Sequence, residues 1–268
     1  MNYYVDKRIR PAFNYYGGKS MLCHKILQMA PSHTTYVECF AGGLNVLLNK
    51  YRSDVEVVCD VSTELIKFYQ VLVERCEELI ERVRVTKFDK MTFLAALAAG
   101  DKGCDLTRAI NFLCRQRMSF SGRGVGWAEP ATKVDAWETL PHDLRIVAER
   151  LRGVKILVRS ALELITEYDS PDTFFYCDPP YYSATRVNPN AYVHEMSEMD
   201  HLRLLRLLNM VSGNVILSGY DHPMYNKELA GWDRVEIEMP TGGALRRGEG
   251  TRTQRTEVLW VKPQPSVF

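Results

Sequence analysis

Short apolar runs, separated by helical stretches, restrict the fold of this chain more than any other feature of its sequence. Five of these runs are almost continuously apolar, which is typical of parallel strands buried on both faces of a sheet. They cover residues 35–40, 55–59, 154–159, 173–177 and 214–218. Strands that alternate with helices predict an α/β fold with a doubly wound sheet.

Two further runs, 234–239 and 256–261, complete a predicted sheet of seven strands. The first alternates between apolar and polar residues, and no crossover helix separates it from the second. We therefore expect these last two strands to form an antiparallel pair at the end of the sheet. Ser62 can cap a helix whose apolar face continues to Val83, and Ser197 with Asp200 predicts a capping box.

About seventy residues between the helix that starts at Ser62 and the third strand contain no convincing buried strand. Helical patterns cover residues 91–99 and 106–114, and a glycine-containing stretch at 119–126 is typical of a loop. The sequence therefore predicts an inserted, mostly helical subdomain at residues 86–150. Residues 1–85 and 151–268 would then form the domain that contains the sheet.

Charge and composition exclude some classes of protein. The chain has 268 residues, with 34 Lys and Arg against 33 Asp and Glu, so nucleic-acid binding would have to come from local basic patches. No apolar run approaches the roughly 18 residues of a membrane span, and the N-terminus does not resemble a secretory leader. The seven cysteines include no Cys-x-x-Cys pair, which favours reduced thiols over a zinc site or disulfides and predicts a cytoplasmic protein.

Two elements suggest a ligand site at the ends of the first two strands. Residues 36–43 (YVECFAGG) lead from a strand into small residues, where open α/β sheets bind ligands. Gly42 and Gly43 permit close approach of a ligand to the backbone, although such a pair also suits an ordinary tight turn. Asp60 follows Gly42 by 18 residues and can accept hydrogen bonds from ribose hydroxyls, or cap the following helix.

The tetrapeptide Asp178-Pro179-Pro180-Tyr181, directly after the fourth apolar run, carries the most chemical information. Two prolines cannot continue a central strand and they stiffen the backbone. The Asp178 carboxylate can accept a hydrogen bond from an amino group, and the Tyr181 ring can stack on a flat ring. These residues predict a rigid acceptor site for an exocyclic amine, with a strand-ending turn as the alternative.

The N-terminal stretch 13–19 (FNYYGGK) is interpreted as a loop that closes over an anionic or aromatic ligand. It fails the spacing of an ATP-binding P-loop, because Phe13 or Asn14 stands where the first glycine should be.

Two basic segments, interpreted as loops, are candidates for contact with phosphates, with a solvated basic surface as the alternative. The first, 111–126, contains Arg115, Arg117 and Arg123 and no acidic residue. The second, 241–256, contains Arg246, Arg247, Arg252 and Arg255 against Glu249. Phe120 within the first segment and Trp127 directly after it could insert between or stack on bases.

Taken in order, these segments resemble the Dam-type adenine-specific (N6) DNA methyltransferases over nearly the whole chain. The resemblance rests on FNYYGGK, YVECFAGG, Cys59-Asp60, FFYCDPPYY, NVILSGY and RTEVLWV. It implies a Rossmann-like sheet that uses S-adenosylmethionine (SAM) and residues 86–150 as the target-recognition, DNA-binding subdomain. It also implies direct methyl transfer to the N6 amino group of a flipped-out adenine in double-stranded DNA, without a metal.

The resemblance assigns roles to individual residues. The cofactor residues would be Tyr15, Lys19, Glu38, Phe40, Ala41, Gly42, Asp60 and Asp178, with Ser160 where the family often has an acidic residue beside the SAM adenine. The catalytic residues would be Asp178, Pro179, Pro180 and Tyr181. The DNA-binding residues would be Phe120 and Ser121 of a hairpin together with Arg115, Arg117, Arg123, Arg246, Arg247 and Arg252. Leu44 departs from the family, which usually has a glycine two places after Gly42.

Several alternatives share this chemistry or this fold. The same tetrapeptide serves methylation of cytosine N4, of RNA or of a protein amide, and a non-catalytic nucleic-acid-binding relative would retain the fold. The resemblance favours a site-specific DNA adenine methyltransferase that acts in restriction–modification. We expect it in the cytoplasm of a bacterial or phage-infected cell, as a monomer, with a weak dimer as the alternative.

Overall fold

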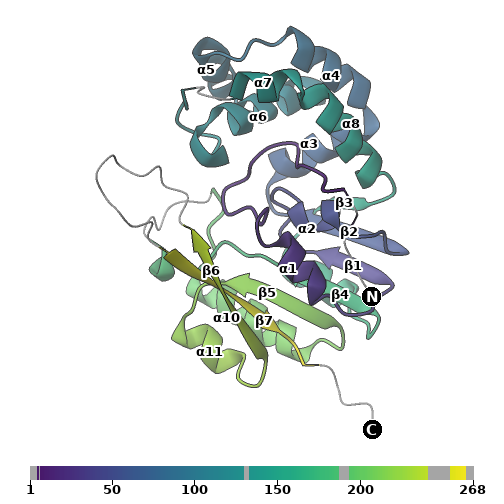
Figure 1. The fold of residues 1–268 in the computed structure, drawn as a ribbon, viewed down its shortest axis with the longest axis vertical. Helices are drawn as coiled ribbons and strands as arrows, with labels where there is room; N and C mark the ends of the chain where they lie inside the picture. The colour runs from purple at the N-terminus through teal and green to yellow at the C-terminus, as the bar shows by residue number, and fades with distance from the viewer. Residues whose placement is uncertain (1–4, 6, 130–132, 187–192, 241–253, 264–268) are drawn as a thin grey trace.

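The sheet has the predicted architecture (Figure 1). The computed structural model describes residues 5, 7–129, 133–186, 193–240 and 254–263. Within these residues, seven strands form one sheet in the order β3-β2-β1-β4-β5-β7-β6. The strands are β1 (Thr35–Glu38), β2 (Val55–Asp60), β3 (Lys155–Val158), β4 (Thr173–Cys177), β5 (Asn214–Gly219), β6 (Asp233–Pro240) and β7 (Gln254–Val261). The first five pair in parallel and β7 is antiparallel to both β5 and β6, which confirms the predicted end of the sheet.

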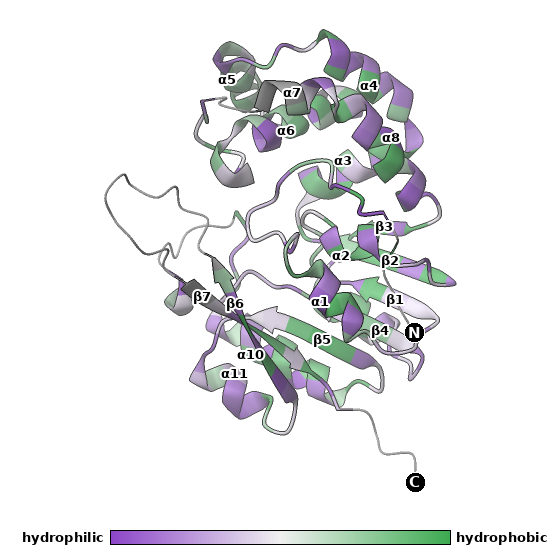
Figure 2. Ribbon diagram, viewed as in Figure 1, coloured by the Kyte–Doolittle hydropathy of each residue, from purple (hydrophilic) through white to green (hydrophobic). Residues whose placement is uncertain are grey.

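Helices cover both faces of the sheet, as a doubly wound fold requires. One face packs against α1 (Cys23–Gln28), α2 (Asn45–Asn49) and α3 (Thr63–Glu74), and the other against α9 (Ala161–Glu167), α10 (Glu198–Met210) and α11 (Pro223–Glu228). Successive strand residues alternate between the two cores: Tyr36 and Val58 lie in one, Val37 and Val57 in the other. Burial on both faces explains why the central strand β5 is mostly hydrophobic in Figure 2.

Both predicted helix caps are present. The Ser62 hydroxyl accepts a hydrogen bond from the Leu65 N–H at 3.4 Å, and Ser197 and Asp200 form a complete capping box. The expectation of one helix from Ser62 to Val83 was wrong, because the chain leaves helical geometry at Arg75 and starts α4 (Cys76–Val85). Two glutamates in the first turn of α4 favour this new helix start, since carboxylates stabilise helix N-termini.

Strand β3 is less buried than its apolar sequence predicts. It lies at the edge of the sheet and pairs with β2 alone among the described residues. Lys155 is exposed, and Val158 retains 43% of its accessible surface. A run of apolar residues therefore indicated a strand correctly here, but not a strand buried on both faces.

The region between β2 and β3 is helical. It contains α4, α5 (Lys90–Ala99), α6 (Asp105–Met118), a short turn η1 (Phe120–Gly122), α7 (Lys133–Glu138) and α8 (Leu140–Leu151). Figure 1 shows these helices grouped beyond α3, at a distance from most of the sheet. The helices predicted at 91–99 and 106–114 are confirmed, and the second continues to Met118. No described helix has the length and apolarity that crossing a membrane would require.

A buried ion cluster ties the helical region to the sheet. Arg150 of α8 and Lys50, which follows α2, both bind the Glu56 carboxylate of β2, at 2.6 and 2.8 Å. All three side chains are almost fully buried. Removal of one partner would leave an uncompensated charge, a change that costs about 3–5 kcal/mol in other proteins.

Candidate active site

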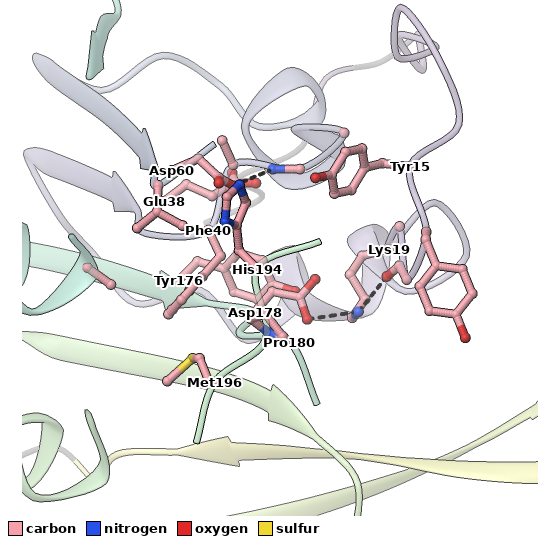
Figure 3. A pocket seen from close by; sticks show the side chains of 18 of the residues that line it. Tyr15, Lys19, Glu38, Phe40, Asp60, Tyr176, Asp178, Pro180, His194 and Met196 are labelled. Atoms are coloured by element: carbon pink, nitrogen blue, oxygen red, sulfur yellow. Dashed lines mark hydrogen bonds and ion pairs between the residues drawn. The ribbon is translucent and has the colours of Figure 1, made fainter. Parts of the chain in front are cut away.

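A cavity of about 280 Å³ opens at the carboxyl ends of β1, β2 and β4 (Figure 3). The strand order reverses between β1 and β4, and open α/β sheets bind ligands beside such a switch point. The cavity brings together residues that the sequence analysis selected from separate segments. They are Tyr15, Lys19, Glu38, Phe40, Ala41, Gly42, Asp60, Ser160, Asp178 and Pro180.

The turn after β1 requires a glycine at position 42. Gly42 has a φ of +45°, and a Cβ atom there would lie 3.2 Å from Cδ1 of the Tyr15 ring. The Gly42 carbonyl accepts a hydrogen bond from the Tyr69 hydroxyl at 2.8 Å, which anchors the turn to α3. Leu44 also has a left-handed backbone, with a φ of +54°. Glycine adopts this backbone conformation without strain, whereas for leucine it is expected to cost about 1–2 kcal/mol.

Asp60 links this turn to the start of α3. Its Oδ1 atom accepts a hydrogen bond from Ser62 N at 2.9 Å, and its Oδ2 atom faces Gly42 N at 3.5 Å. Burial raises the pKa of the Asp60 carboxyl, although these backbone N–H groups oppose the shift. Asp60 therefore supports the helix start and also lines the cavity. Ser160 likewise supports a helix start and lines the cavity, since its hydroxyl accepts a hydrogen bond from Leu162 N at the start of α9.

Glu38, at the end of β1, is buried and held by two donors. The Tyr36 hydroxyl donates to Glu38 Oε2 at 2.8 Å, and Leu47 N donates to the same atom at 3.0 Å. Burial raises the pKa of Glu38 to about 8, against the effect of these two hydrogen bonds.

Asp178 and Lys19 form an ion pair at the cavity edge. Lys19 Nζ lies 2.8 Å from Asp178 Oδ1 and donates a hydrogen bond to Gly17 O at 2.7 Å (Figure 3). The Asp178 Oδ1 atom itself is buried. Burial raises the pKa of Asp178 to about 6, although Lys19 opposes this shift. The site therefore contains a buried carboxylate oxygen that can accept a hydrogen bond from a ligand.

Tyr181 is buried and its hydroxyl is bound, which the sequence did not indicate. Only 4% of Tyr181 is exposed, and its hydroxyl donates to Glu257 Oε2 at 2.8 Å. Lys19 Nζ lies 4.7 Å from the centre of its ring, and the Tyr220 ring packs edge-on at 4.5 Å. Neither Tyr181 nor Pro179 lines the cavity. A role for the Tyr181 ring in stacking stays a prediction, and it would require these neighbours to rearrange.

Sequence reasoning missed two further components of the site. Residues 193–196 line the cavity, and Figure 3 shows the His194 side chain extending toward Asp60. A 2.5 Å ion pair between Arg186 and Glu195 secures this segment. The other missed component is Glu257, which follows three polar residues in β7 and carried no signal in the sequence.

The interpretation of Arg115 and Arg117 as loop residues was wrong. Both lie in α6, because its buried apolar face extends to Met118. Arg115 forms a 2.5 Å ion pair with Glu64 of α3, and Arg117 Nε donates to Ala12 O at 2.8 Å. Burial lowers the pKa of Arg117 to about 10. Contact of either side chain with DNA stays a prediction, and it would compete with these internal partners.

The hairpin after α6 is exposed and lies against the N-terminal loop. A β-bridge between Ser119 and Trp127 closes it, and Phe120 retains 65% of its accessible surface. A Cβ atom on Gly122 would lie 2.0 Å from Asn14 O, so glycine is required at this contact. The Arg123 guanidinium lies 5.7 Å from the centre of the Tyr16 ring. Ser121 is also exposed, whereas Arg246, Arg247 and Arg252 lie outside the described residues.

A comparison with known families identifies this fold and site. The model of the D12 class N6 adenine-specific DNA methyltransferases matches residues 15–230. The chain belongs to this family. The match spans the cavity, the helical region and the tetrapeptide at residues 178–181, and it confirms the resemblance seen in the sequence. This protein is therefore a DNA methyltransferase with the Rossmann-like sheet predicted for it.

Two curated relatives support the assignment. The chain is 22% identical to the Type II methyltransferase M.MjaIII of Methanocaldococcus jannaschii over 263 residues, which cover 85% of this chain and 91% of that protein. It is 33% identical to the modification methylase StsI of Streptococcus sanguinis over 100 residues. This second match covers 34% of the chain and only 15% of StsI.

Proposed function

We propose that this methyltransferase transfers a methyl group from SAM to the N6 amino group of adenine at specific sites in double-stranded DNA. The observation that carries the proposal is the Asp178 carboxylate beside the cavity, whose buried Oδ1 atom is held 2.8 Å from the Lys19 ammonium group. A carboxylate oxygen can accept more than one hydrogen bond, so Asp178 can also accept one from a ligand amino group. The rigid Pro179-Pro180 backbone places a further carbonyl next to it.

The cavity has groups suited to each part of SAM. Asp60 would accept hydrogen bonds from the ribose hydroxyls, and Gly42 would let the backbone approach the methionine part, beside Glu38. Tyr15 and Lys19 would close the N-terminal side, and Ser160 with Leu162 would border the adenine. SAM, when bound, supplies an activated methyl group.

The chain's own residues would then orient the amino group of the target base. The ionised Asp178 carboxylate would accept one amino hydrogen and the Pro179 carbonyl the other, which directs the nitrogen lone pair toward the methyl group. Because the methyl donor is already activated, positioning supplies most of the catalysis. A stacked base in a duplex cannot reach the end of a sheet, so the adenine would have to leave the helix.

Methylation of cytosine N4 or of RNA is the alternative with the same chemistry. Membership of an N6-adenine family favours adenine in DNA. Transfer of a labelled methyl group should occur to duplex DNA and not to RNA of the same sequence. Labelling of RNA alone would overturn the proposal, and labelling of neither would support a non-catalytic nucleic-acid-binding protein.

Replacement of Asp60 by alanine should weaken SAM binding by about 1–3 kcal/mol, because the ribose would lose a charged acceptor. Calorimetry measures this change directly. Asp54→Ala, an exposed acid at the other end of β2, is the matched control and should bind SAM normally. An unchanged affinity in Asp60→Ala would mean that Asp60 serves only the turn and the start of α3.

The helical region and its hairpin would recognise DNA. Replacement of Arg123 by glutamine should weaken duplex binding and reduce its salt dependence by about one unit of slope, as expected for one lost phosphate contact. Arg152→Gln, at the end of α8, is the control, because this residue is 75% exposed and should leave the slope unchanged. An equal salt slope in Arg123→Gln and the unmodified protein would exclude contact between Arg123 and the phosphates.

A further inference from the structure

Glu257 occupies an unusual place in the sheet. Strand β5 ends at Gly219, which pairs with Val258 of the antiparallel strand β7. Glu257 precedes Val258 in this antiparallel strand, so it lies just beyond the carboxyl end of β5, opposite Ile237 of β6. Functional groups of α/β enzymes lie beyond this same edge. The register therefore places an acidic side chain next to the tetrapeptide that follows β4.

The Glu257 carboxylate interacts with both Tyr181 and Lys19. Its Oε2 atom accepts a hydrogen bond from the Tyr181 hydroxyl at 2.8 Å and lies 4.0 Å from Lys19 Nζ. The Lys19 ammonium group thus lies between two carboxylates, 2.8 Å from Asp178 and 4.0 Å from Glu257. Lys19 is only 4% exposed, so solvent screens this three-charge cluster weakly.

We propose that Glu257 is a positioning residue of the methyl-transfer site. It fixes Tyr181 through the hydroxyl and shares the Lys19 ammonium group with Asp178, so that Asp178 can accept the target amino group. The part that concerns the amino group rests on the function proposed above. When the amino group approaches Asp178, Lys19 has a second carboxylate within reach and is not left as an unpaired buried charge.

Charge on Glu257 should also control the protonation of Asp178. Burial raises the pKa of Asp178, Lys19 lowers it, and Glu257 raises it. Replacement of Glu257 by glutamine retains an acceptor for Tyr181 but removes the negative charge, so the pKa of Asp178 should fall. The other ionisable groups that interact with Asp178 are Glu38 of β1, Tyr176 of β4, Tyr181 and Tyr225 of α11.

The test is a titration of the Asp178 carboxyl carbon by NMR in the free protein, with the signal assigned by its loss in Asp178→Asn. The midpoint should be near pH 6 in the unmodified protein and lower in Glu257→Gln. Glu238→Gln removes the same charge from an exposed position on β6 and should leave the midpoint unchanged. Equal midpoints in Glu257→Gln and the unmodified protein would overturn the proposed charge sharing. This experiment uses neither SAM nor DNA, so its result is independent of the proposed substrate.

Kinetics test the effect on the reaction. The acid limb of kcat/KM should move to lower pH in Glu257→Gln, whereas Glu257→Ala, which also loses the hydrogen bond to Tyr181, should lose about tenfold or more in kcat. Tyr181→Phe removes that hydrogen bond but keeps the charge, so its acid limb should stay closer to that of the unmodified protein. A kcat in Glu257→Ala equal to that of Glu257→Gln would exclude the role of Glu257 in fixing Tyr181. Absence of methyl transfer by the unmodified protein would instead contradict the function proposed above.

Discussion

Replacement of Asp178 by alanine should lower the rate of methyl transfer to DNA by about 10²–10³-fold, the effect of removing one group that stabilises a transition state. The variant would lack the acceptor that orients the amino group, while the rest of the cavity would remain. The protein should stay folded, because Asp178 belongs to neither hydrophobic core and Glu257 remains as a carboxylate 4.0 Å from the buried Lys19 ammonium group.

The matched control is Asp172→Ala. Asp172 is an exposed acid just before the opposite end of β4, far along the strand from the cavity, and its loss should not affect turnover. Single-turnover assays with saturating SAM separate the rate of transfer from cofactor binding. Turnover in Asp178→Ala equal to that in Asp172→Ala would contradict the proposed role of Asp178.

Replacement of Lys19 by methionine should shift the pH dependence of the reaction upward. In the unmodified protein, Asp178 is ionised above about pH 6, so kcat/KM should fall as the pH decreases through this value. Lys19 lowers the pKa of Asp178, and the variant loses this effect. The pKa of Asp178 should therefore rise, activity at neutral pH should decrease, and part of it should return at higher pH.

Lys25→Met provides the control for Lys19→Met. Lys25 is an exposed lysine in the last turn of α1, and its replacement should leave the pH profile unchanged. A loss of activity in Lys19→Met that is the same at every pH would indicate that Lys19 acts only in binding or folding. The upward shift expected for Lys19→Met is opposite to the downward shift expected for Glu257→Gln, so the pair tests the charge cluster from both sides.

The parts of the fold that depend on local patterns could be predicted from the sequence. Strand β4 has the predicted bounds, because a run buried on both faces is almost fully apolar and the prolines at 179 and 180 end it. The capping box at Ser197 follows from two residues three positions apart. Strand β3 shows the limit of this reasoning, since its position at the sheet edge depends on strand order and not on its own sequence.

The site could be predicted only where its residues lie in recognisable local segments. The cavity unites the N-terminal loop, the turn after β1 and Asp178, all of which carried a signal. Glu257 and His194 carried none, because their place depends on the register of β7 and on a segment that folds back over the cavity. The interpretation of Arg115 as a loop residue was wrong for a related reason, because its charge did not show that it would lie in α6 and bind Glu64.

The most direct test of the proposed function is to identify the methylated nucleoside. Duplex DNA would be treated with the purified protein and methyl-labelled SAM, digested to nucleosides and analysed by mass spectrometry, with Asp178→Ala as the control. The proposal predicts label in N6-methyladenosine of the deoxyribose series, and none in the control reaction. Label in N4-methyldeoxycytidine, or equal label with Asp178→Ala, would contradict it.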